Sequence, residues 1–292
     1  MRITTSMLQQ SVLGSIQANL QRMATAQDQV SSGKRITKAS DDPVAAAQIM
    51  RTSRDLDALT QVQRNVTSAQ TRVSAEDSVL NQLTNLVSRA QELAIEQSSS
   101  TATAATRATT KVEVDGLLSQ AVQLGNTQVG NEYIFGGAQT TVAPFQADGT
   151  YVGDDTERQA EIGQGFYSPT NHTGRALLVT SGLVPALTAL SSALNSGSGS
   201  AVGNAVTGLN QANTQIQSLV ADTGARANQL DTAAQSATAL TANLTARQST
   251  LRDADVGTAS TELLAAQTSL QAALLAASRV LPTTLASYMG ST

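Results

Sequence analysis

Two long stretches of this sequence place apolar or small residues three or four positions apart, the spacing that keeps one face of an α-helix apolar. The first stretch runs from Leu59 to Ala94, with Glu76 as a polar exception, and the second runs from Ile216 to Leu251. At about 1.5 Å per residue, a continuous helix over the first stretch is about 50 Å long. The sequence therefore predicts a mainly α protein, a long antiparallel bundle of coiled-coil type formed by N- and C-terminal arms.

Both ends of the chain carry shorter segments with the same pattern. Many seam positions of the long stretches are Ala or Thr, which bury little area each, so an arm of only two such helices is marginally stable alone. We therefore predict that the apolar residues of the two ends form an interface between molecules. These residues are Leu13, Ile16, Leu20, Met23 and Val30 near the N-terminus, and Leu263, Leu270, Leu274, Leu281 and Leu285 near the C-terminus.

The middle of the chain has a different composition. The sequence contains three Phe, four Tyr and no Trp, and all of these aromatic residues except Tyr288 lie between Tyr133 and Tyr167. Short aromatic and β-branched runs alternate there with Gly-Gly, Asp-Gly and Asn-His-Thr-Gly, which are typical of strands and turns. We predict a small β-rich domain at residues 130–182, and a flexible Gly/Ser connector at Asn195 to Asn204 that leads back into helix.

These patterns divide the chain into three predicted domains. Residues 1–42 and 253–292 form terminal assembly helices that are disordered in the monomer, because their apolar faces lack a partner. Residues 43–129 and 183–252 form the long helical bundle, and the β-rich insert occupies the middle.

Helix-ending and helix-starting residues interrupt the N-terminal arm at "SSGKRITKASDDPVAAA". Gly33 suits a helix C-cap, where the backbone is left-handed. Asp42 can accept hydrogen bonds from the free N–H groups of the next helix, and Pro43 fits its first turn. We interpret Gly33, Asp42 and Pro43 as a hinge with its caps, and not Asp41-Asp42 as an acid–base pair.

No group of residues in the sequence is typical of an enzyme or a metal site. The chain has no cysteine and one histidine, His172, which we interpret as a solvated loop residue. Asp148, Asp154 and Asp155 lack the spacing and the terminal Glu of a calcium loop and are interpreted as turn carboxylates. We expect no catalytic residue, no bound metal and no cofactor.

Charge and hydropathy limit the kinds of partner that the chain is expected to bind. The net charge is −4 and Lys and Arg form no blocks, which argues against nucleic acid. The apolar runs are too short or too polar for a cleaved signal peptide or a membrane span, so no membrane insertion is expected. These features fit a cytoplasmic protein or one that is exported without cleavage of a signal.

Both arms resemble the bacterial flagellin family. The segment "QVSSGKRITKASDDPVAAAQIMR" is similar to the family's N-terminal signature, in which a Ser-Ser-Gly turn, a short basic stretch and an Asp-Asp pair precede a helix. The segment "LRDADVGTASTELLAAQTSLQAALLAASRVLPTTLASYM" resembles its C-terminal signature. Within the family, "GNEYIFGGAQTTVAPF" looks more like the hook–filament junction proteins than the filament flagellins, which are the alternative.

The resemblance implies a structural subunit of the flagellum that joins hook to filament by self-assembly through its terminal helices. It implies an extracellular location, reached through the flagellar type III export apparatus. The implied partners are further copies in a ring or helical tube, the other hook–filament junction protein, flagellin and an export chaperone. A cytoplasmic signalling coiled coil is a more distant alternative, because such proteins share Ala-rich heptads but lack an aromatic β insert.

Overall fold

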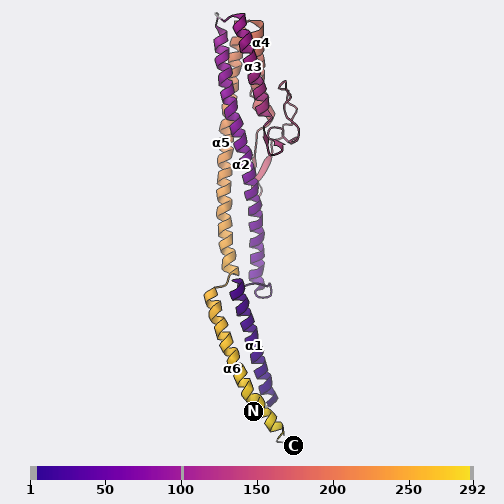
Figure 1. Cartoon of the computed structure of the whole chain (residues 1–292), viewed down its shortest axis with the longest axis vertical. Coiled ribbons are helices and arrows are strands. Elements are labelled where there is room, and N and C mark those ends of the chain that lie inside the picture. The colour runs from indigo at the N-terminus through magenta and orange to yellow at the C-terminus, as the bar shows by residue number, and fades with distance from the viewer. Residues whose placement is uncertain (1–4, 100–101, 290–292) are drawn as a thin grey trace. The chain divides into compact units, whose positions relative to one another are not determined.

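Helices dominate the computed structural model, which describes residues 5–99 and 102–289 (Figure 1). This confirms the predicted mainly α fold. The chain divides into two compact units, residues 1–57 with 241–292, and residues 58–240. The helices are α1 (Thr5–Ser32), α2 (Pro43–Ser98), α3 (Ala104–Gly125), α4 (Leu183–Ser196), α5 (Gly199–Arg252) and α6 (Val256–Met289).

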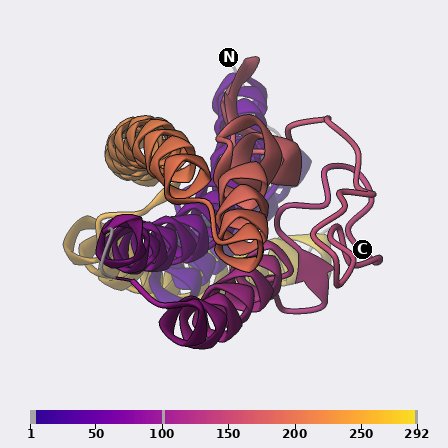
Figure 2. The same ribbon diagram turned by 90° about the horizontal axis from the view of Figure 1, so that it is seen from above.

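In the unit of residues 58–240, α3 and α4 pack beside α2 and α5, as the view along the helices shows (Figure 2). Here α2 and α5 run antiparallel, as two hydrogen bonds between them show. Gln70 Nε2 donates to Asp231 Oδ1 at 2.8 Å, and Gln91 Nε2 donates to Asn210 Oδ1 at 2.9 Å. Each fully buried Leu contributes about 1.5–3 kcal/mol, so this unit holds the main apolar core. Its enclosed side chains include Leu80, Leu83, Leu187, Leu190, Leu209 and Ile216.

The predicted flexible connector at Asn195 to Asn204 is wrong for most of its length. Gly197 ends α4 in the left-handed conformation, with φ of 73°, and α5 begins only two residues further on. The Ser198 hydroxyl accepts a 3.3 Å hydrogen bond from the N–H of Ala201 and so caps the new helix. Val202 is fully buried, so the core anchors the first turn of α5 despite its glycines.

The insert between α3 and α4 contains little regular sheet. Most of its remaining chain is irregular, yet Ile134, Phe135 and Phe145 are buried in the same core as the helices. The insert therefore depends on the helices for its burial. Its regular elements are two antiparallel ribbons and a π-helix: β1 (Gln128–Val129) with β2 (Glu132–Tyr133), β3 (Gln159–Gly163) with β4 (Phe166–Pro169), and η1 (Arg175–Thr180).

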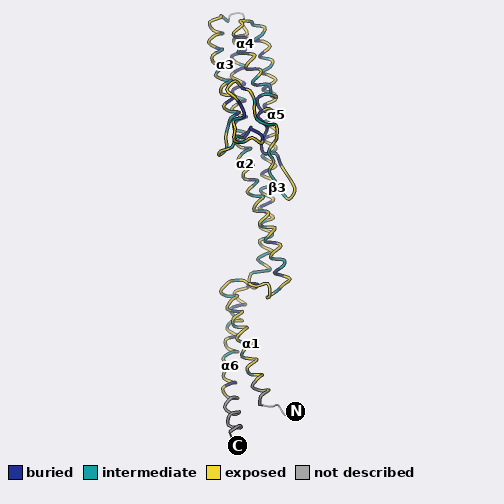
Figure 3. Tube along the Cα trace, turned by 90° about the vertical axis from the view of Figure 1, so that its right-hand side faces the viewer, coloured by how far each residue is buried: buried dark blue, intermediate teal, exposed yellow. Residues whose placement is uncertain are grey.

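In the unit formed by the two ends of the chain, α1 and α6 lie side by side (Figure 1). Among the described residues of these two helices, exposed and half-buried positions prevail (Figure 3). Among their described side chains, the buried ones are Ala26, Ala259, Ala266 and Ala277. Contacts made by such small side chains contribute little apolar burial.

Candidate assembly interface

The break in the N-terminal arm begins where α1 ends. Gly33 has φ of +66°, and its N–H donates to the carbonyl of Gln29 at 2.9 Å. An L side chain in this left-handed region costs about 1–2 kcal/mol, which explains the glycine. Pro43 is the first residue of α2, and Asp42 Oδ1 accepts a 3.0 Å hydrogen bond from the N–H of Ala45. The three residues predicted as hinge and caps thus lie at the ends of the two helices.

Asp41 closes the loop between these helix ends. Its Oδ2 accepts hydrogen bonds from the N–H groups of Lys38 at 2.8 Å and Thr37 at 3.1 Å. These backbone hydrogen bonds, Lys38 first, hold the pKa of the Asp41 carboxyl below its ordinary value. Sequence reasoning assigned a capping role to Asp42 alone and missed this second aspartate.

A second break, between α5 and α6, is paired with the first. The N–H of Arg35 donates to the carbonyl of Arg252 at 2.7 Å, and the N–H of Ala254 donates to the carbonyl of Gly33 at 2.9 Å. Arg35 Nη2 also donates to the carbonyl of Leu251 at 2.8 Å. The two arms are therefore interrupted at the same level and joined there by backbone hydrogen bonds, a pairing that sequence spacing does not reveal.

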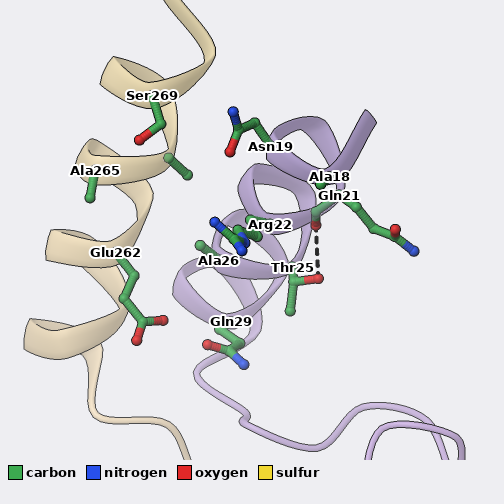
Figure 4. A pocket seen from close by; sticks show the side chains of 11 residues that line it. Ala18, Asn19, Gln21, Arg22, Thr25, Ala26, Gln29, Glu262, Ala265 and Ser269 are labelled. Carbon is green, nitrogen blue, oxygen red and sulfur yellow. Dashed lines mark hydrogen bonds between the residues drawn. The ribbon is translucent and has the colours of Figure 1, made fainter. Parts of the chain in front are cut away.

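A groove of about 720 Å³ runs between α1 and α6 (Figure 4). One wall carries Ala18, Arg22 and Thr25 from α1, and the other carries Glu262 and Ala265 from α6. The lining residues are small or polar, with one charge of each sign. The groove therefore offers room for side chains of another helix, and it lacks the convergent acid, base or nucleophile of a catalytic site.

The predicted interface residues fall into groups with different exposure. Ile16, Met23, Val30, Leu263 and Leu270 are half-buried, on the helix faces that also carry the buried Ala26 and Ala266. By contrast, Leu13, Leu20 and Leu274 are 59%, 44% and 51% exposed. Leu281 and Leu285 lie outside the residues whose side chains the structure describes.

Two further exposed leucines on α6 escaped the sequence pattern. Leu264 is 62% and Leu275 is 65% exposed. They lie about three turns apart, since a turn takes about 3.6 residues, and so share one line along the helix. That line is on the face away from the buried Ala266 and Ala277. The eleven-residue spacing is the signal that could have found them.

The structure corrects the interpretation of His172 as a solvated loop residue. The side chain is buried, and Nδ1 lies 2.7 Å from Glu76 Oε1 while Nε2 lies 2.9 Å from Asp222 Oδ2. Burial, the largest single influence, disfavours the imidazolium, but the hydrogen bond and charge of Glu76 outweigh it and raise the pKa of His172 above its ordinary value. The sequence conceals this site because the partners are 96 and 50 positions away.

The three aspartates interpreted as turn carboxylates bind partners within the insert. Asp148 and Asp154 accept backbone hydrogen bonds from Thr150 and Thr156, and Asp155 pairs with Arg175. Within residues 5–99 and 102–289, no three His, Cys, Asp or Glu side chains gather as metal ligands. No helix in that part of the chain is long and apolar enough to cross a membrane.

Comparison with known proteins matches both arms. A model of the bacterial flagellin N-terminal helical region matches residues 3–140, and a model of the C-terminal helical region matches residues 206–289. Flagellar hook-associated protein 3 from Salmonella typhimurium is 33% identical over 189 residues, which are 63% of this chain and 60% of that protein. The chain thus spans less than two thirds of that relative's length.

Two more distant similarities cover more of the chain. The flagellar filament 30.7 kDa core protein from Treponema maltophilum is 24% identical over 236 residues, 78% of each protein. A solved structure of a putative flagellar hook-associated protein from Vibrio parahaemolyticus superposes with a TM-score of 0.66 at 18% identity, covering 72% of this chain and 99% of that one. At this identity the match shows a shared fold.

Proposed function

Because this chain belongs to the bacterial flagellin family, we propose that it is a structural subunit of the flagellum that joins the hook to the filament. One observation carries the choice within the family. The chain is 33% identical to a flagellar hook-associated protein 3, against 24% to a flagellar filament core protein. The role is mechanical, and no enzymatic step is part of it.

Assembly proceeds through α1 and α6. Each helix turns one face toward the other and leaves a second apolar stripe uncovered, Leu13 and Leu20 on α1 and Leu264 and Leu275 on α6. Covering one such leucine with a neighbouring copy contributes about 1.5–3 kcal/mol, and the same gain recurs at every subunit. Leu274 flanks the α6 stripe, and the groove with Arg22 and Glu262 admits side chains of the neighbour.

The paired breaks act as the hinge of this interface. Gly33 and Asp42 end one helix and begin the next, while the Arg35–Arg252 hydrogen bond keeps the two arms together at the break. The terminal helices can then be reoriented as a pair during assembly. Half-buried Ile16, Met23, Val30, Leu263 and Leu270 hold that pair together.

The partners follow from this role. They are further copies of the chain in a ring or tube, the other hook–filament junction protein, flagellin, and an export chaperone that covers the apolar stripe of α6 before assembly. The site of action is outside the cell, reached through the flagellar export apparatus without cleavage of a signal peptide.

Labelling on intact flagella tests the assignment. An antibody against residues 130–182 should give a single band between hook and filament. Label along the whole filament would instead support a filament flagellin, the role that the Treponema similarity favours. Label confined to the cytoplasm would contradict both and favour a signalling coiled coil.

A further inference from the structure

The buried histidine joins three separate elements of the unit formed by residues 58–240. His172 belongs to the insert, Glu76 to α2 and Asp222 to α5. The Glu76 side chain is fully enclosed and that of His172 is 7% exposed, whereas Asp222 is half-exposed. Glu76 Oε1 also accepts a 3.0 Å hydrogen bond from the backbone N–H of His172. His172 thus links the insert to both long helices.

The geometry dictates the protonation state of the ring. A carboxylate offers only acceptors, and a neutral imidazole has one N–H donor and one lone pair. Since each ring nitrogen of His172 faces a carboxylate oxygen at hydrogen-bond distance, both nitrogens must carry protons to satisfy both contacts. The bound form is therefore the imidazolium.

Further charges continue the cluster on the solvent side. Arg226 Nε donates to Asp222 Oδ2 at 2.8 Å, and Arg226 Nη1 donates to the carbonyl of Asn171 at 3.1 Å. Arg226 Nη2 lies 3.6 Å from Glu157 Oε1. Along this series of contacts, from Glu76 through His172, Asp222 and Arg226 to Glu157, negative and positive groups thus alternate. Loss of the positive charge on His172 leaves the enclosed carboxylate of Glu76 without its counter-ion.

We propose that His172 is a pH-sensitive latch, whose contacts with both α2 and α5 are complete only while its imidazole carries both protons. Loss of one proton turns a donor into a lone pair that faces a carboxylate, and an uncompensated charge in a buried place is strongly unfavourable. The half-exposed Asp222 provides the side from which solvent reaches the ring. This latch does not depend on the position of the protein in the flagellum.

The direction of the pH effect follows from linkage. The pKa of His172 is raised in the folded state, so the latch is complete below the unfolded-state pKa of about 6.5 and is lost as the pH rises through the folded-state pKa. Between these two pKa values, local opening of the insert should increase by up to about tenfold per pH unit. Alkaline conditions therefore weaken this attachment of the insert, and acidic conditions keep it complete.

The single histidine makes the first experiment unambiguous. In an NMR titration of the full chain, the only imidazole signals belong to His172. We expect their midpoint to lie above that of the same signals in the urea-unfolded chain. A midpoint at or below the unfolded value overturns the proposal, and this measurement needs no variant.

Hydrogen exchange on the same samples measures the release itself. The amides of Thr170 and Gly174, which donate to the carbonyls of Arg158 and Phe135, report on the insert. After correction for intrinsic exchange rates, their protection should fall with rising pH relative to amides of α3 and α4. Protection that is independent of pH overturns the proposal.

Variants at the enclosed carboxylate separate the latch from a general effect of charge. Glu76→Gln preserves the shape of the side chain and should lower the midpoint of the imidazole and remove most of the pH dependence of insert protection. Asp77→Asn, one position along α2, makes the same change of net charge at a residue whose hydrogen-bond partner in the described part of the chain is Asn81 of its own helix. It should behave as the wild type. Equal effects of the two variants would overturn the specific role of Glu76 and His172.

Discussion

The N–H of Arg35 donates a 2.7 Å hydrogen bond to the carbonyl of Arg252, and this contact joins the break after α1 to the break after α5. Lys34 and Asp253 form an antiparallel bridge beside it. Backbone hydrogen bonds of this kind do not depend on the identity of the side chains, so we expect the pairing to persist when single surface residues change. The two interruptions therefore act as one structural feature.

Gly33→Ala should weaken the end of α1. The φ of +66° is unfavourable for alanine, although an added Cβ would meet no atom within 4 Å, so the cost of about 1–2 kcal/mol comes from the backbone alone. Amides of the last turn of α1 should exchange about five- to thirtyfold faster. Gly14 also has open space around it but lies within α1, away from its ends. The substitution Gly14→Ala should therefore slow the exchange of nearby amides. Identical behaviour of the two variants would argue against the left-handed cap.

Asp42→Ala should destabilise the first turn of α2 by about 1 kcal/mol, because the N–H of Ala45 loses its acceptor. Asp42→Asn should be close to neutral, since asparagine caps helices as well as aspartate does. Exchange at Ala45 and Ala46 measures both effects. Asp42 also lies 3.7 Å from Arg35 in a half-exposed ion pair, which contributes little in water. If the Asn variant were as unstable as the Ala variant, the ion pair and not the cap would be responsible.

Charges on the free stripe of α6 should block assembly without unfolding the monomer. The double variant Leu264→Asp, Leu275→Asp changes two exposed side chains, so its melting temperature should stay within about 2 °C of the wild type. In an assembled tube the same carboxylates would be buried, at a prohibitive cost. Motility and sedimentation of the assembled protein give the readout, with Val112→Asp, at an exposed position of α3, as control. Normal assembly of the double variant would remove this stripe from the interface.

Phe135→Ala should destabilise the unit of residues 58–240 by about 3–5 kcal/mol, because its ring is fully buried between insert and helices. Phe166→Ala makes the same substitution on a ring that is 73% exposed and should change the free energy of unfolding by less than about 0.5 kcal/mol. Urea denaturation of both variants provides the comparison. Similar losses would mean that the insert contributes little to the shared core.

Limited proteolysis should remove the ends of the chain first. The buried side chains described in α1 and α6 are alanines, so these helices gain little from contact with each other. Cleavage of the purified monomer should fall within residues 1–35 and 253–292 while residues 58–240 survive as a folded fragment. Resistant ends in a chain shown to be monomeric would contradict the prediction that they order on assembly.

Much of the architecture follows from local pattern. The three-four spacing from Leu59 to Ala94 and from Ile216 to Leu251 indicates helix wherever it occurs, and both runs lie within single helices, α2 and α5. The left-handed preference of glycine and the N-cap chemistry of aspartate act over a few residues, so Gly33 and Asp42 could be placed without a tertiary structure.

The contact faces of α1 and α6 were harder to predict from the sequence. Leu13, Leu20 and Leu274 fit the heptad spacing, yet they lie outside the contact between the two helices. Alanine and leucine at neighbouring positions both suit a seam, and only the packing of the partner helix determines which of them is buried.

Contacts between distant segments depended on the folded chain. In the sequence, Glu76 interrupts a heptad pattern and His172 lies in a turn motif. The fold brings Glu76 Oε1 and His172 Nδ1 to 2.7 Å, so each side chain is the buried hydrogen-bond partner of the other. The same holds for the breaks at Arg35 and Arg252, which spacing along the chain cannot pair. Helix formation and capping are governed by residues within one or two turns, and so they can be predicted from the sequence. Buried charge pairs and the burial of an insert arise only when separate helices exclude water together.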